Sequence, residues 1–75
     1  MARSQTTLVE IVFSREIVDP GTCVSRLLSM TGGIQRACRS AMDGKPASAV
    51  LEVPDTLLWA FEAQLERDRS VAWFV

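Results

Sequence analysis

The sequence has no histidine, and Cys23 and Cys38 are its only cysteines among 75 residues. Without histidine, no Ser-His or Cys-His pair can activate a nucleophile. A structural zinc site, which needs about four cysteine or histidine ligands, is excluded as well. A single cysteine pair does not make a disulfide framework. We therefore expect a protein that is not an enzyme and that carries no metal or other cofactor.

Long apolar runs are also missing. The longest are far shorter than the roughly 20 residues that a membrane-spanning helix requires. The polar start, MARSQTT, leads into a short apolar stretch without the core or cleavage site of a signal peptide. Free cysteines suit a reducing compartment. These features predict a cytoplasmic protein with no membrane association.

Charge is nearly balanced but unevenly distributed. The net charge of −1 argues against bulk attraction to nucleic acid or to an anionic membrane. Residues 1–45, however, carry six basic against four acidic residues, whereas residues 46–75 carry two against five. A chain this short buries only about 60% of its unfolded surface, so an unusually full core or association with another chain would have to stabilise it.

Residues 47–75 form the clearest unit of the sequence. Residues 47–53 alternate as a strand does, Pro54 stops the strand, and Asp55 caps a following helix. The last run, VAWFV at 71–75, has no polar residue, which is typical of a central or covered strand. The helix between them has this apolar stripe: Leu57, Leu58, Phe61 and Leu65.

The first half of the chain is less regular. We expect residues 1–7 to be a frayed lead-in and 8–13 (LVEIVF) to be a strand. Asp19 and Pro20 suit the cap and first position of a helix that starts at about Pro20. Gly44 and Pro46 suit its end, as a left-handed cap and a helix breaker.

Gly32 and Gly33 lie in the middle of this helical region. Apolar residues keep three- and four-residue spacing across them, which favours one continuous helix. Two interior glycines cost about 2 kcal/mol, however, and one helix from Pro20 to Met42 would be about 35 Å long. Strands of this chain reach only about 20 Å. We favour two helical segments with a break or kink at Gly32–Gly33, and the continuous helix remains the alternative.

The predicted fold is a single small α/β (or α+β) domain over residues 1–75. Its order is β-α(α)-β-α-β, with a three-stranded sheet and the helices packed on one face. Strands separated by helices suggest parallel pairing through right-handed crossovers. An antiparallel position for one strand stays open.

Period-2 alternation divides the predicted strands into two faces. The more apolar face is expected to form the core with Val9, Ile11, Phe13, Ala49, Leu51, Val53, Val71, Trp73 and Val75. The second face combines apolar residues with two glutamates and a serine, and such patches mark interfaces. Its predicted partner-binding residues are Leu8, Glu10, Val12, Val50, Glu52 and Phe74. On the helix, Trp59 lies off the apolar stripe beside Glu62, and we count both as contact residues.

The predicted function is a small protein-interaction module: an adaptor, subunit or inhibitor that binds and occludes a partner protein. A homodimer and an origin in a mobile element are compatible with it. The alternative is a nucleic-acid-associated regulator that uses Arg26, Arg36, Arg39 and Lys45. If the glycines at 32–33 opened onto a helix N-terminus, that end could also bind an anion near these arginines.

Overall fold

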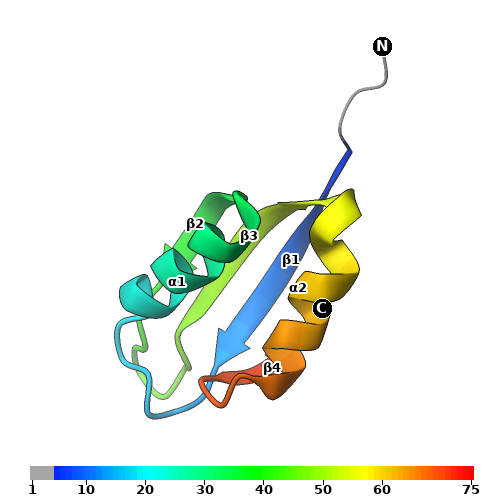
Figure 1. Cartoon of the computed structure of the whole chain (residues 1–75). Coiled ribbons are helices and arrows are strands. Elements are labelled where there is room, and N and C mark those ends of the chain that lie inside the picture. Colours follow the sequence, from blue (N-terminus) through cyan, green and yellow to red (C-terminus); the bar gives the residue numbers. More distant parts are fainter. Residues whose placement is uncertain (1–4) are drawn as a thin grey trace.

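The computed structural model describes residues 5–75, which form one four-stranded sheet and two helices (Figure 1). The elements in chain order are β1 (Thr6–Phe13), α1 (Gly21–Thr31), β2 (Ile34–Arg39), β3 (Ser48–Pro54), α2 (Asp55–Arg67) and β4 (Val71–Phe74). The chain is therefore a small α+β domain, in agreement with the predicted class. Part of the predicted lead-in, residues 1–4, lies outside the described residues, and Thr6 and Thr7 already belong to β1.

The strands lie in the order β2-β3-β1-β4, and every neighbouring pair is antiparallel. Each helix connects two strands that are separated by one intervening strand, so the β-α-β units are split. This is the β-α-β-β-α-β arrangement called ferredoxin-like. The predicted parallel pairing is thus wrong, because each helical crossover leaves room for a third strand between the two that it joins. The fourth strand was not predicted.

The additional strand, β2, replaces the predicted second helical segment. The break itself is confirmed: α1 ends at Thr31, and Gly32 follows in the left-handed region with φ 66°. The buried residues Val24, Leu27 and Thr31 account for the helical spacing before the break. Beyond it the same spacing continues by coincidence, because all six residues of β2 are exposed at the edge of the sheet.

A tight turn at Asp43–Gly44 connects the β2 region to the β3 region. Both residues have positive φ, 49° and 77°, and Met42 and Lys45 exchange two backbone hydrogen bonds of 3.1 and 2.8 Å across them. Such a pair of left-handed residues is the preferred two-residue hairpin turn, for which Asp-Gly is a favoured sequence. Gly44 therefore belongs to a hairpin turn. The prediction that it caps the end of a helix is wrong.

The ends of α1 and α2 carry residues that stabilise helix termini. The Asp19 carboxylate accepts a 3.0 Å hydrogen bond from the Gly21 N–H at the first turn of α1. In α2, Asp55 lies in the first turn and Arg67 in the last, as the helix dipole favours. The predicted helix starts near residues 20 and 55 are confirmed to within a residue.

Both helices cover the same side of the sheet (Figure 1). Their buried residues Val24, Leu27, Phe61 and Leu65 pack on the sheet to form the core. The predicted core residues of β1 and β3 are confirmed, since each is at most 3% exposed. These sheet residues are Val9, Ile11, Phe13, Ala49, Leu51 and Val53.

The close approach of β2 to β3 gives a test of this fold. A Cβ atom at Gly33 would lie 2.6 Å from the backbone carbonyl oxygen of Glu52, which cannot move without shifting β3. We expect Gly33→Ala to lower the free energy of unfolding by about 2 kcal/mol, as overpacking does. The matched variant Gly21→Ala meets only the flexible Asp19 side chain and should change it by less than about 0.5 kcal/mol. Equal effects in urea denaturation would contradict the described approach of the strands.

Candidate functional site

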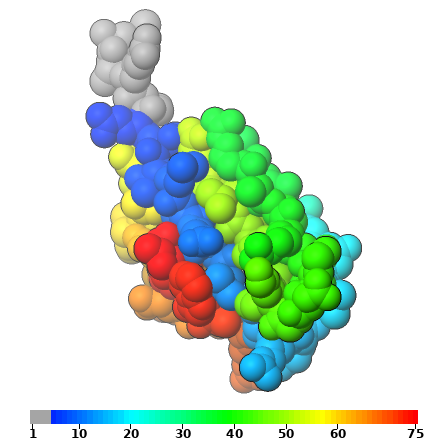
Figure 2. Space-filling view, turned by 180° about the vertical axis from the view of Figure 1, so that it is seen from behind, coloured from blue at the N-terminus to red at the C-terminus, as the bar shows by residue number. Residues whose placement is uncertain are grey.

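The candidate site is the side of the sheet that faces away from the helices, which we call the open face. No helix among residues 5–75 covers it, and the strands themselves form the surface seen in Figure 2. Burial in β3 alternates strictly: Ala49, Leu51 and Val53 are buried, while the residues between them are half-buried. The register then places these neighbours on the open face: Leu8, Glu10 and Val12 of β1, and Ser48, Val50 and Glu52 of β3.

The two edge strands complete the open face. In β2, Ile34, Ala37 and Arg39 lie opposite Glu52, Val50 and Ser48. In β4, Trp73 lies opposite Val12. Cross-strand partners share a face of the sheet, so all four of these edge residues belong to the open face. Val75 joins them, because its backbone exchanges two hydrogen bonds with that of Glu10.

A bulge in β4 corrects the predicted faces of that strand. Phe13 pairs with Val71, but Val12 pairs with Trp73, so Ala72 is an extra residue. One inserted residue moves everything beyond it to the opposite face. Trp73 and Val75, predicted in the core, are therefore 50% and 77% exposed, whereas Phe74 pairs with Ile11 and packs against the core. The strand is also at the edge of the sheet and is not central or covered as predicted.

Four of the nine large apolar side chains that are exposed within residues 5–75 lie on the open face. Leu8 is 60% exposed and Ile34 52%, in addition to Trp73 and Val75. Trp73 was missed as a site residue, because nothing in VAWFV distinguishes a bulged strand from a regular one. Val12 is only 8% exposed and contributes little accessible surface, although it lies on this face.

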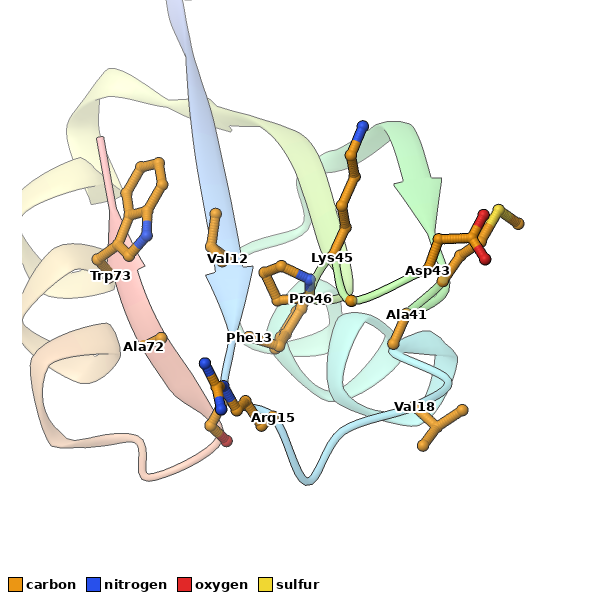
Figure 3. A pocket seen from close by; sticks show the side chains of 13 residues that line it. Val12, Phe13, Arg15, Val18, Ala41, Asp43, Lys45, Pro46, Ala72 and Trp73 are labelled. Atoms are coloured by element: carbon orange, nitrogen blue, oxygen red, sulfur yellow. The ribbon is translucent and has the colours of Figure 1, made fainter.

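A hollow of about 730 Å³ lies at one end of the open face (Figure 3). Trp73 and Ala72 of β4 line one side of it, and Lys45 and Pro46, just before β3, line the other. Arg15 closes its lower end in this view, and the Asp43 side chain lies on the side remote from Trp73. The hollow therefore combines apolar walls with two cationic side chains, Arg15 and Lys45, and one acidic side chain, Asp43.

The carboxylate of Glu52 is held by neighbours on the open face. It accepts hydrogen bonds of 2.6 Å from the Thr6 hydroxyl and from the Arg36 guanidinium, which also forms an ion pair with it. The bond from Thr6, followed by that from Arg36, lowers the pKa of Glu52 below its ordinary value. Glu52 and Arg36 thus largely satisfy each other, which leaves Arg15, Arg39 and Lys45 as the cations of this side without an ion-pair partner within residues 5–75.

The predicted nucleic-acid cations are not all on one surface. Arg26 projects from α1 and forms a 2.6 Å ion pair with Asp68, in the turn between α2 and β4. Gly32 and Gly33 lead into a strand, so the anion site imagined at a helix N-terminus is wrong. Arg36, Arg39 and Lys45 do lie together, along β2 and its hairpin.

The other predicted contacts lie apart from the open face. Trp59 is 75% exposed on α2, and Glu62, one turn further on, is half-buried. This helix packs on the opposite side of the sheet from Trp73. Trp59 and Glu62 therefore stay predictions of a second, separate contact, and they do not extend the open face.

Within residues 5–75, no group of three or more cysteine and acidic side chains is placed to hold a metal ion. No helix in the described part of the chain is long and apolar enough to cross a membrane. Comparisons of the sequence and structure with protein-family models, curated proteins and solved structures gave no significant match.

The Asp68 cluster that precedes β4 gives a pH-dependent prediction. Burial alone would raise the pKa of Asp68, but hydrogen bonds from the Ser70 hydroxyl and N–H and from Arg26 hold it below the ordinary value of 3.8. Because the folded pKa is the lower one, these contacts stabilise the fold fully above pH 3.8 and are lost as the pH falls through the folded value.

We therefore expect Asp68→Asn to lower the free energy of unfolding by about 1 kcal/mol at pH 7, allowing for the exposed Arg26 partner. The difference from the original protein should shrink progressively below pH 3.8 in chemical denaturation. Glu66→Gln, on the exposed side of α2, serves as the control. A difference that does not change with pH would show that the Asp68 charge is not involved.

Proposed function

We propose that this protein is a non-catalytic interaction module that binds a partner protein through the open face of its sheet. The observation that carries the proposal is the exposure of Leu8, Ile34, Trp73 and Val75 on a sheet face without a helical cover among the described residues. Exposed apolar side chains gathered on one face are typical of an interaction surface. An adaptor, a subunit and an inhibitor would each use such a surface by occluding or bridging the partner.

Trp73 is the expected centre of this contact. Tryptophan is enriched among the few residues that dominate binding energy, and such residues lie beside well-formed pockets. Trp73 lines the hollow at the end of the open face, so an apolar side chain of the partner could insert beside it. Two cations, Arg15 and Lys45, against one acid, Asp43, at the same hollow favour a partner that is acidic around this side chain.

The two tryptophans provide a matched test. We expect quantitative affinity purification with the original protein to enrich a partner that the Trp73→Ser variant loses by about tenfold or more, as a central contact residue would. Trp59→Ser removes an equally large exposed side chain on α2 and should retain that partner. Retention of every partner by Trp73→Ser, or capture of none by the original protein, would contradict the proposal.

A single-stranded nucleic acid is the second candidate partner, favoured by one observation. The open face brings Trp73 onto the same side as Arg36, Arg39 and Lys45, although they are distant in the sequence. An aromatic side chain for base stacking beside cations for the phosphates is how sheet surfaces bind single strands. The ion pair of Arg36 with Glu52 and the single aromatic residue make this the weaker of the two proposals.

This alternative predicts binding that depends on salt and on specific charges. A fluorescent single-stranded oligonucleotide should bind at low ionic strength, and charge reversal at Arg39 or Lys45 should weaken it severalfold. The same reversal at Arg67 on α2 changes the net charge equally and should have little effect. Fluorescence anisotropy that shows no binding at low salt, or equal losses in all three variants, would exclude the alternative.

A further inference from the structure

The two edges of the sheet differ in their protection against pairing with another strand. The outer strand β2 carries Arg36 and Arg39. Charged side chains on an edge are a common device against strand addition. The other edge, β4, continues to Val75 without one charged side chain or proline. Only β4 therefore presents an apolar strand edge without such protection.

The register shows which backbone groups of β4 face outward. Val75 exchanges hydrogen bonds of 2.9 and 3.1 Å with Glu10 of β1, and Trp73 lies opposite Val12. In an antiparallel pair, bonded positions recur at every second residue. Phe74, between these two, consequently directs its N–H and carbonyl away from β1, toward the free edge. A shallow hollow lined by Leu65, Glu66 and residues 71–74 runs beside this edge.

We propose that β4 pairs antiparallel with β4 of a second copy of this chain, which joins two sheets into one of eight strands. A two-fold axis brings the same surface of both copies together, so a strand suits this contact when it carries no charge that would meet its own copy. The side chains of 71–75 meet that condition, whereas β2 would place arginines against arginines.

The simplest register places Phe74 opposite Phe74 of the second copy. The two residues then exchange both of their outward hydrogen bonds across the axis. Trp73 comes to lie beside Val75 of the second copy on the open face, and cross-strand pairs of this kind stabilise sheets. The open faces of both copies would form one continuous surface. The pairing does not depend on the proposed function, since it needs no other partner.

Hydrogen exchange on the unmodified protein tests the backbone contact directly. The Phe74 amide should exchange more slowly as the protein concentration rises from about 10 μM to about 1 mM, the range expected for a small interface. The Val75 amide, bonded to Glu10 within one chain, should not respond to concentration. Sedimentation equilibrium over the same range should show the mass rising from monomer toward dimer. A monomeric mass throughout, or a Phe74 amide insensitive to concentration, would overturn the pairing.

Charge exchange at Trp73 tests the geometry. Trp73→Lys and Trp73→Glu should each raise the dimer dissociation constant at least about tenfold, because each removes the contacts of Trp73 with Val75 of the second copy and places two like charges at diagonal positions across the axis. A 1:1 mixture of the two variants should dimerise again, since the two diagonal side chains then carry opposite charges.

Two controls match these variants. Trp59→Lys makes the same substitution on α2, and Ile34→Lys adds a lysine to the β2 edge, and both should dimerise like the original protein. Dissociation by Ile34→Lys but not by Trp73→Lys would assign the contact to the other edge and refute the proposal. Failure of the mixture to recover, with both variants folded by circular dichroism, would refute the two-fold pairing at β4. A variant that loses the partner protein found by affinity purification but still dimerises would bear on the proposed function and leave the β4 pairing intact.

Discussion

The pairing of β1 with β3 is the constraint on which the rest of the structure depends. Seven consecutive residue pairs, from Thr6–Pro54 to Val12–Ser48, fix these two strands in one register. Since side chains alternate with a period of two, this register decides at once which residues reach the helices and which reach the open face. Val9, Ile11, Leu51 and Val53 must then be buried together, and both helices need an apolar stripe over the same pair of strands. Shifting β1 by one residue against β3 would move the core residues of β1 to the open face and its open-face residues into the core.

Local patterns in the sequence predicted most of this central layer. Alternation in residues 8–13 and 47–53 identified both strands and the residues that they bury, and the Asp and Pro residues near 20 and 55 located the starts of both helices, although Asp55 is the first residue of α2 and not its cap. Gly32 was correctly taken as a break. What failed was the interpretation of the segment after it, because its apolar residues happen to continue a helical spacing. The Asp43–Gly44 dipeptide, a favoured hairpin turn, was the one available signal for the missing strand.

The candidate site was predictable only in part, because local patterns in the sequence do not reveal contacts between distant parts of the chain. Leu8, Glu10, Val12, Val50 and Glu52 lie on the open face where strand alternation placed them. Phe74 and Trp73 exchanged roles because of the single bulged residue at Ala72. A bulge depends on how β4 meets β1, a contact between distant parts of the chain, and the five letters VAWFV do not encode it locally. The grouping of Trp73 with Lys45 around one hollow likewise arises only from the strand order.

The position of β1 has a consequence for the order in which the chain is assembled. This strand is synthesised first, yet both of its neighbours, β3 and β4, lie in the second half of the chain. During synthesis its apolar residues must remain unpaired until at least β3 has followed, whereas the β2–β3 hairpin needs only its own short turn to form. Local contacts of this kind form quickly, and distant strand pairings form slowly. The β2–β3 hairpin is therefore expected to provide the edge onto which β1 docks, so the first strand to be made is among the last to be placed.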